Sequence, residues 1–234
     1  MESTRSYELR SKGSNPLETT NRLKSFTMES IKETCYKGTR ILLGNGKRDL
    51  INKMIEVLKK EGFVEIQIPI IQYQEIFKSK VGQENTNMMF NFKDRGDRDI
   101  CLAPEYTAVV QQLSKTTFKY TKDVKIFYVA ECFRGEKPQE GRYREFTQLG
   151  VEILNPSKEY MTYLQGLALE LMGDRACIID TDATRGLDYY KGGKGFEIAC
   201  PELGAQKQVC GGGEYDGGVG FALGIDRILL TKNP

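Results

Sequence analysis

The stretch Cys132–Glu152, CFRGEKPQEGRYREFTQLGVE, is the most informative part of the sequence. It joins two apolar segments, 124–133 and 146–153, through a charged, glycine-containing loop. Apolar segments connected in this way are typical of a β-hairpin and therefore of an antiparallel sheet. Three arginines belong to the loop and its flanks: Arg134, Arg142 and Arg144. Held on a rigid hairpin, their guanidinium groups could bind phosphate oxygens, although a solvated basic loop is the alternative.

The sequence around this hairpin predicts further helices and strands. Residues 46–61 place apolar side chains at helical spacing and end at Gly62. Residues 63–71 alternate apolar and polar side chains, as a strand does, until Pro69 removes a backbone donor. Further strands are predicted at 89–92, 100–102, 186–190, 196–199 and 208–210, and further helices at 105–113, 158–172 and 224–230. We therefore expect an α+β fold with an antiparallel β-sheet flanked by helices.

The first forty residues differ in composition from the rest of the chain. Residues 1–40 are rich in Ser, Thr, Glu, Lys and Arg and contain few side chains that could build a core. We expect a mobile polar arm there, with one helix near 24–36, followed by a globular domain at 41–234. The basic residues of the arm could assist RNA binding, or the arm could be a solvated tail.

Composition excludes several classes of function. The 234 residues include no histidine, so Ser-His-Asp catalysis, Cys-His catalysis and histidine metal sites are impossible. The formal net charge of +2 does not by itself indicate a nucleic-acid partner. Six cysteines form no CxxC pair, so we expect reduced thiols rather than a zinc site. No apolar run is long enough to span a bilayer, and we expect a cytoplasmic protein without a membrane partner.

The common phosphate-binding loops are missing from the sequence. Neither GxxxxGK[ST] nor GxGxxG occurs, and the glycines at 211–213 and 217–218 match neither pattern. If a nucleotide binds, side chains such as the hairpin arginines must therefore hold its phosphates.

Several motifs, in order along the chain, resemble those of class II aminoacyl-tRNA synthetases of the histidyl type. The hairpin sequence resembles motif 2, FRxExPQxGRYRxFxQxGxE. The other matches are APEYTA at 103–108, which resembles RPEGTA; RGLDYY at 185–190 with FE at 196–197, which resembles the histidine-binding signature; GFALGIDRILL at 220–230, which resembles motif 3; and the helix, strand and Pro69, which resemble motif 1. Together they cover residues 41–230.

This resemblance implies the activation of an amino acid, with histidine the expected substrate, by ATP in the presence of Mg²⁺. No side chain is assigned to hold the metal. The implied ATP contacts are Arg134 and Arg185 at the α-phosphate, Arg142 and Arg227 at the outer phosphates, Glu136 at the adenine and Phe146 stacked on the base. Because the substrate carboxylate is the nucleophile, Arg134 and Arg185 are the expected catalytic residues, and no histidine is needed. The motif 1 resemblance also implies a homodimer.

A second set of residues is implied for the amino acid. Glu105, Thr107 and Gln148 match groups that hold the α-ammonium. Glu152 and Tyr189 match groups that read the imidazole, with Tyr128 and Tyr190 nearby. Tyr128 lies in an apolar strand and could equally be a core residue. Burying Glu105 or Glu152 without a cationic partner would be costly, which favours a binding role for both.

The chain departs from the family pattern in several places. Ala103 and Tyr106 replace an arginine and a glycine of RPEGT, and Glu214 replaces the arginine of GGRYDG. Few residues separate Glu152 from Arg185, and the sequence stops shortly after motif 3, so we expect neither the insertion domain nor the anticodon-binding domain of the family. The acyl acceptor is therefore open: it could be tRNA, recognised through its acceptor end, or another molecule.

Three functions remain in competition. The first is the ATP-dependent ligase. The second is a regulatory paralogue without catalysis, similar to the regulatory subunit of ATP phosphoribosyltransferase or to the synthetase-like sensor domain of a starvation-sensing kinase. The third is a dimerisation module. A regulator has no physical need for four phosphate-binding arginines in separate motifs, so Arg134, Arg142, Arg185 and Arg227 favour the enzyme.

Overall fold

The computed structural model describes residues 35–42, 44, 46–78, 87–184, 190–204 and 207–231. The first 34 residues of the expected mobile arm, including most of its predicted helix, lie outside the described residues. So do residues 186–189 of the strand predicted at 186–190.

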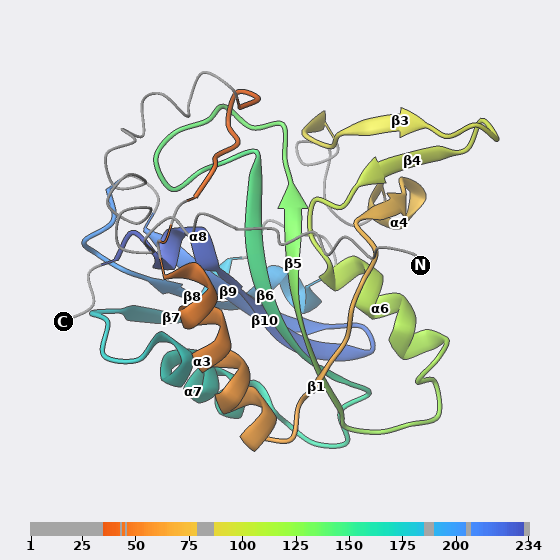
Figure 1. Ribbon diagram of the computed structural model, residues 1–234. Coiled ribbons are helices and arrows are strands. Elements are labelled where there is room, and N and C mark those ends of the chain that lie inside the picture. The colour runs from red at the N-terminus through yellow and green to blue at the C-terminus, as the bar shows by residue number, and fades with distance from the viewer. Residues whose placement is uncertain are drawn as a thin grey trace, which may run out of the picture.

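A seven-stranded sheet forms the centre of the molecule, with the order β1-β5-β6-β10-β9-β8-β7 (Figure 1). The strands are β1 (Val64–Glu65), β5 (Val124–Phe133), β6 (Glu145–Leu154), β7 (Ile178–Thr184), β8 (Lys194–Ala199), β9 (Gln208–Tyr215) and β10 (Gly218–Gly224). Neighbouring strands pair antiparallel, except that the edge strand β1 runs parallel to β5. The prediction of an α+β fold with an antiparallel sheet is confirmed, and β1 is its parallel addition.

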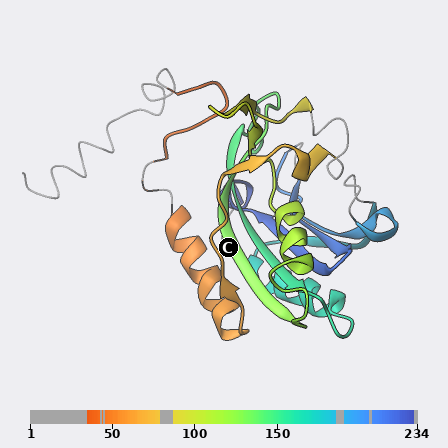
Figure 2. The ribbon, with the colours of Figure 1, turned by 90° about the vertical axis from the view of Figure 1, so that its right-hand side faces the viewer.

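Helices and a smaller sheet cover the two faces, and Figure 2 shows α3 and α6 on opposite sides of the central strands. One face packs against α3 (Lys47–Lys60), α7 (Met161–Met172) and α8 (Ile225–Ile228). The other packs against α4 (Glu75–Lys78), α6 (Thr107–Lys115) and a three-stranded sheet of order β2-β4-β3, made of β2 (Ile71–Tyr73), β3 (Asn91–Lys93) and β4 (Asp99–Leu102). A 3-10 turn at Lys191–Gly193 precedes β8.

Successive side chains along the central strands point to opposite faces of the sheet, and the two faces differ in polarity. Phe127 and Val151 point into the core beneath α3 and α7, whereas their neighbours Tyr128 and Glu152 point toward α6. Successive strand residues face opposite sides of a sheet, so this register gives one apolar face and one face with buried polar groups. The second face carries the candidate site.

The observed elements correct several sequence predictions. The strand predicted at 63–71 is divided into β1 and β2, with Pro69, which cannot donate to a ladder, between them. The strand predicted at 208–210 continues to Tyr215. The helix predicted at 224–230 covers only Ile225–Ile228, and Gly224 is the last residue of β10. Strands β7 and β10 were not predicted.

No helix in the described part of the chain is long and apolar enough to cross a membrane.

Candidate functional site

The loop between β5 and β6 is shaped by a tight turn at its tip. Gln139 and Arg142 exchange two backbone hydrogen bonds, of 3.0 and 2.9 Å. Between them, Gly141 has a φ of 72°, a left-handed conformation that favours glycine. The turn reverses the chain, and Arg142 contacts Glu136 on the other side of the loop.

Arg134 and Phe146, the first two ATP residues predicted from the hairpin, lie together. The Arg134 guanidinium carbon is 5.1 Å from the centre of the Phe146 ring, a cation–π distance. Arg134 Nε donates to the backbone oxygen of Pro104 at 2.9 Å. This bond connects the end of β5 to the segment that precedes α6, and it fixes one side of the guanidinium group.

Arg142 and Arg227 approach the same region from different motifs. Arg142 forms an ion pair with Glu136, whose side chain is 9% exposed. Arg227, in α8, donates from Nε to Gly141 O at 2.7 Å and from Nη1 to Gln208 O at 2.6 Å. Burial lowers the pKa of Arg227, and the charges of Arg134 and Arg142 lower it further. The three arginines thus produce a concentrated positive potential next to the hairpin loop.

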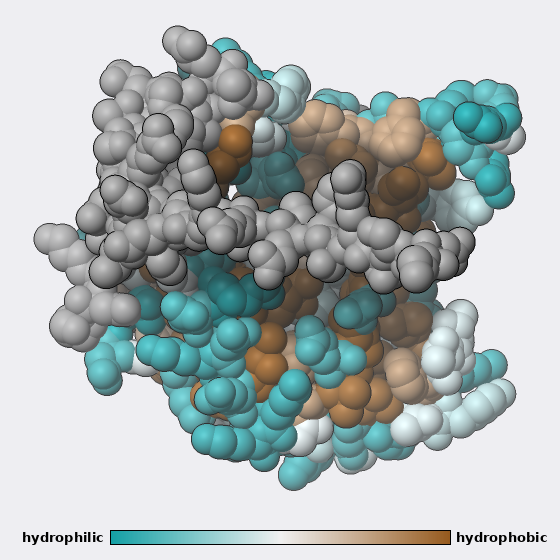
Figure 3. Space-filling model, viewed as in Figure 1, coloured by the Kyte–Doolittle hydropathy of each residue, from teal (hydrophilic) through white to brown (hydrophobic). Residues whose placement is uncertain are grey.

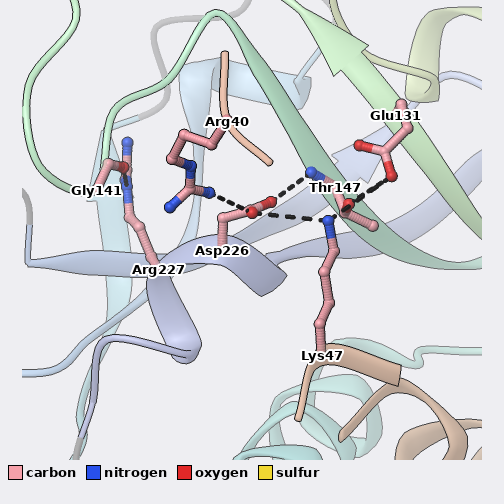
Figure 4. A network of polar contacts seen from close by, with 7 residues as sticks. All are labelled: Arg40, Lys47, Glu131, Gly141, Thr147, Asp226 and Arg227. Carbon is pink, nitrogen blue, oxygen red and sulfur yellow. Dashed lines mark hydrogen bonds and ion pairs between the residues drawn. The ribbon is translucent and has the colours of Figure 1, made fainter. Parts of the chain in front are cut away.

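A network around Asp226 supports this arrangement (Figure 4). The buried Asp226 carboxylate accepts from the Thr147 backbone N–H at 2.6 Å and pairs with Arg40 at 2.6 Å and Lys47 at 3.6 Å. Lys47 also lies 3.8 Å from Glu131 Oε1, which accepts from the Thr147 hydroxyl at 2.7 Å. The network joins α3, β5, β6 and α8, and it fixes the residue next to Arg227.

Residues preceding the globular core pack directly on the hairpin loop. Arg40 lies over the Tyr143 ring, with its guanidinium carbon 3.2 Å from the ring centre. Arg144 donates from Nη1 to the Tyr36 hydroxyl at 2.9 Å, and its backbone N–H donates to Gly38 O at 2.8 Å. Arg144 therefore holds this segment in place, and it faces residues 36–38 rather than the other three arginines.

Glu152 is the centre of the predicted amino-acid subsite and is fully buried. Thr107 donates to its Oε1 at 3.1 Å, and the Tyr215 hydroxyl donates to its Oε2 at 2.9 Å. Burial raises the pKa of Glu152 to about 8, although the two hydroxyls oppose this shift; the Glu105 charge adds to it. Tyr215 was missed by the sequence prediction, although it belongs to the segment matching GGRYDG and could have been taken from there.

The other predicted substrate residues surround Glu152. The Glu105 carboxylate accepts from the Ala108 N–H at 3.1 and 3.3 Å and so holds the first turn of α6. The Tyr128 side chain is 1% exposed, and its hydroxyl makes no hydrogen bond of normal geometry with any described residue. The side-chain oxygen of Gln148, at the edge of this group, accepts from the Cys132 thiol at 3.1 Å.

Glycines on β6 and β10 make room for these side chains. A Cβ at Gly150 would collide with the Tyr128 ring, and one at Gly220 would collide with the Glu152 carboxylate. A Cβ at Gly218 would come within 2.5 Å of the Tyr215 ring. Gly150, Gly218 and Gly220 therefore leave the space that the buried side chains of Tyr128, Tyr215 and Glu152 occupy against the sheet.

Two of the sequence departures lie near the same group. Tyr106, where the family has glycine, is completely buried; its ring centre is 5.3 Å from that of Tyr128, and its hydroxyl donates to Glu131 O at 2.9 Å. Ala103, where the family has arginine, belongs to the same buried cluster. Glu214, in contrast, is partly exposed and lies 3.8 Å from Lys191 Nζ.

Of the three remaining predicted residues, the structure describes only Tyr190. Tyr190 is 7% exposed and forms an isolated bridge with Tyr215, so it lies beside the Glu152 group. Arg185 and Tyr189 lie outside the described residues. Within the described ranges, no group of three or more Cys, Asp or Glu side chains is arranged to hold a metal ion.

An antiparallel sheet with an arginine-bearing hairpin, and a third arginine from a short helix after the last strand, is the arrangement of a class II aminoacyl-tRNA synthetase catalytic domain. The family profile described as histidyl-tRNA synthetase matches residues 45–173. The histidine–tRNA ligase of Clostridioides difficile is 30% identical over 291 residues, with 77% of this chain and 69% of that protein covered. The chain therefore belongs to the histidyl-tRNA synthetase family, whose named relatives are ligases of the aminoacyl-tRNA synthetase type.

Solved structures agree with this assignment. The apo histidyl-tRNA synthetase of S. aureus superimposes with a TM-score of 0.68 at 26% identity, covering 84% of this chain and 69% of that one. A Bacillus halodurans protein described as an ATP phosphoribosyltransferase regulatory subunit/histidyl-tRNA synthetase gives a TM-score of 0.67 at 15% identity, covering 82% of this chain and 81% of that one. The second likeness concerns the fold alone.

Proposed function

We propose that this protein activates an amino acid, with histidine the expected substrate, by forming an aminoacyl-adenylate from ATP. The observation that carries the proposal is the position of two groups of side chains, one of arginines and one of glutamates. Three arginines gather at the hairpin loop, and two buried glutamates lie at the start of α6, where Glu105 bonds to Ala108 and Glu152 bonds to Thr107. The Arg134–Pro104 hydrogen bond directly joins the two groups, because Glu105 follows Pro104 in the chain.

The arginine group is suited to a nucleoside triphosphate. Arg134, Arg142 and Arg227 would bind the phosphates, since guanidinium groups stay charged and can bind phosphate oxygens in pairs. Phe146 would stack on the adenine and Glu136 would accept from its amino group. Both residues now contact arginines, so ATP would replace an arginine contact in each case.

The glutamate group is suited to the amino acid. An α-ammonium would be attracted to Glu105, with Thr107 and Gln148 as further acceptors. The N–H of an imidazole would be read by Glu152, with Tyr128, Tyr190 and Tyr215 beside it. The Tyr128 hydroxyl, buried and without a described hydrogen-bond partner, provides a polar atom that a substrate could satisfy.

The reaction requires position and charge rather than an enzyme nucleophile. An oxygen of the substrate carboxylate attacks the α-phosphorus, the bond from that phosphorus to the bridging oxygen breaks, and pyrophosphate leaves. Arg134 would stabilise the negative charge that collects on the five-coordinate phosphorus. Arg142 and Arg227 would hold the departing phosphates, and the sequence assigns Arg185 to the α-phosphate as well.

The described residues do not form a metal cage of their own. Mg²⁺ usually retains water and is held largely by substrate phosphates, so it would be expected to enter with ATP and neutralise phosphate charge. The protein's own cationic contribution is the arginine group.

Histidine-dependent ATP–pyrophosphate exchange tests the proposal. We expect exchange with the unaltered protein and a loss of at least about a hundredfold in Arg134→Ala, the size of effect seen when one group that stabilises the transition state is removed. Arg95→Ala is the matched control, because Arg95 is exposed in the turn between β3 and β4. Folded protein that gives no exchange with any amino acid would contradict the proposal and favour the regulatory paralogue.

The acyl acceptor is a separate proposal. We infer transfer to the acceptor end of tRNA in the cytoplasm, as in protein biosynthesis, from a homodimeric enzyme. Incubation with labelled histidine, ATP and total tRNA should give acid-precipitable label that alkaline hydrolysis releases. Adenylate formation without labelled tRNA would point to a different acceptor while leaving the activation step intact.

A further inference from the structure

Two cysteines face each other at the edge of the central sheet. In the β7–β8 ladder, Ile178 lies opposite Ala199, and one step further along each strand places Cys177 opposite Cys200. The two Sγ atoms are 3.1 Å apart, and both cysteines are free thiols. The backbone register and the sulfur distance therefore both bring the thiols together.

The backbone at this position is compatible with a disulfide. Directly opposite residues of an antiparallel pair have Cα atoms about 4.5 to 5.5 Å apart. Disulfides in proteins join Cα atoms about 4.4 to 6.8 Å apart. A bond between Cys177 and Cys200 would therefore need rotation of the two side chains and little movement of the strands.

The two thiols differ in access. Cys177, directly before the edge strand β7, is partly exposed, whereas Cys200 is completely buried. Burial raises the pKa of Cys200 to about 12, and its contact with Cys177 adds to this; the positive charge of Arg175 opposes it. Cys177 is consequently the thiol that an oxidant from solvent would reach first.

We propose that Cys177 and Cys200 are a modification site: a peroxide converts them to a disulfide that a dithiol reductant reverses. The Cys177 sulfur attacks one peroxide oxygen, the O–O bond breaks, and water and a Cys177 sulfenic acid form. The Cys200 sulfur then attacks the Cys177 sulfur, the S–S bond forms, and the hydroxyl leaves as water with the Cys200 proton. Two electrons pass from the sulfurs to one peroxide molecule.

The disulfide would close the chain from Cys177 to Cys200 into a covalent loop containing β7 and β8. It would link the edge strand β7 covalently to β8. The register of the β7–β8 ladder shifts between Asp180 and Ala183. This inference does not rest on the proposed ligase activity, because its readouts are chemical.

Peptide mapping of the full chain tests the site. After treatment with hydrogen peroxide, we expect the intact mass to fall by two hydrogen atoms and the titratable thiols to fall by two. Digestion with trypsin without reductant should then give peptide 176–185 linked to peptide 195–207, and dithiothreitol should separate them. The absence of this linked pair, or oxidation of separate cysteines to sulfinic acids, would overturn the proposal.

Two variants refine the test. Cys177→Ser should abolish the linked peptide and the loss of two hydrogens. Cys35→Ser is the matched control, because Cys35 is also a partly exposed thiol, and it should leave both results unchanged. A linked peptide that persists between other cysteines in Cys177→Ser would also contradict the assignment. The mapping of the unaltered chain decides the question even if a variant fails to fold.

Discussion

Glu152 combines complete burial with a raised pKa, and this has a consequence for stability. In the unfolded chain its carboxyl group loses a proton near its ordinary pKa of 4.5, whereas in the folded protein it does so near 8. Between these values the folded state holds a proton that the unfolded state has released. The free energy of unfolding must therefore decrease as the pH rises through this range.

We expect this decrease to reach at most about 5 kcal/mol. Urea denaturation of the unaltered protein and of Glu152→Gln, at pH 5 and pH 8, measures the contribution, because glutamine does not titrate. Glu56→Gln, on the exposed side of α3, is the control and should keep the pH dependence of the unaltered protein. Equal pH dependence in all three proteins would show that Glu152 titrates normally.

Gly220 allows a second prediction for a single residue. A Cβ at this position would collide with the Glu152 carboxylate and lie 2.5 Å from the Val151 backbone oxygen, which cannot move away easily. Gly220→Ala should therefore lower the free energy of unfolding by about 3 kcal/mol. Gly166→Ala is the matched control: Gly166 lies inside α7 with open space around its Cβ direction, so alanine should raise stability by about 1 kcal/mol. Similar stability in both variants would contradict the role assigned to Gly220.

At the scale of elements, Asp226 connects α8 to α3 and β6. Asp226→Ala would leave the Thr147 N–H without its acceptor and Arg40 without its partner, so we expect a loss of about 3 kcal/mol in urea denaturation. Asp99→Ala breaks an exposed ion pair with Lys93 and should cost less than about 1 kcal/mol. Comparable losses would mean that the buried network contributes no more than a surface pair.

The elements that the sequence predicted well are those in which apolar residues recur at a regular spacing and in which the ends are marked by the sequence. Strand β5 was predicted at its observed limits, and α3 differs by one residue at each end, because both carry regular apolar patterns. Strand β10, GVGFALG, was missed because glycine replaces the side chains that would have shown alternation. Gly218 and Gly220 are required because the side chains of Tyr215 and Glu152 lie against them. The alternating apolar pattern is therefore absent from the sequence for a structural reason.

The candidate site was predicted to a similar extent. The family resemblance implied Arg134, Arg142 and Arg227, and in the structure the charges of Arg134 and Arg142 act on Arg227. The sequence could not identify Asp226 and Arg40 as partners, because their contact joins positions 186 residues apart. Long-range ion pairs have no local sequence pattern.

At the scale of the whole molecule, the surface near β1 and β2 supports the proposed dimer. Val64 and Ile71 are 63% and 54% exposed. Beside them, a groove of about 580 Å³ is lined by apolar side chains that include Ile66, Leu113 and Phe118. Figure 3 shows brown, hydrophobic surface gathered in this part of the face. Exposed apolar side chains beside an apolar groove are typical of a protein interface.

We therefore expect sedimentation to show a dimer and Val64→Glu to convert it toward monomer. Ile178→Glu is the matched control, since Ile178 is 62% exposed on β7 at the opposite edge of the sheet, and it should remain dimeric. A monomeric unaltered protein at micromolar concentration would contradict the dimer, whereas dissociation of Ile178→Glu alone would move the interface to the other edge.

The order of strands also affects the order in which parts of the sheet can fold. Strands β5 and β6 form one local hairpin, and β7 to β10 form a second set of neighbours in sequence order, whereas the pairing of β6 with β10 joins residues about seventy positions apart. Closing so long a loop is slow compared with forming a hairpin. Each set can form early, but Glu152 meets Tyr215 only after β6 and β10 have paired. The amino-acid subsite should accordingly be among the last features to appear during folding, and during synthesis it must wait until β10 has left the ribosome.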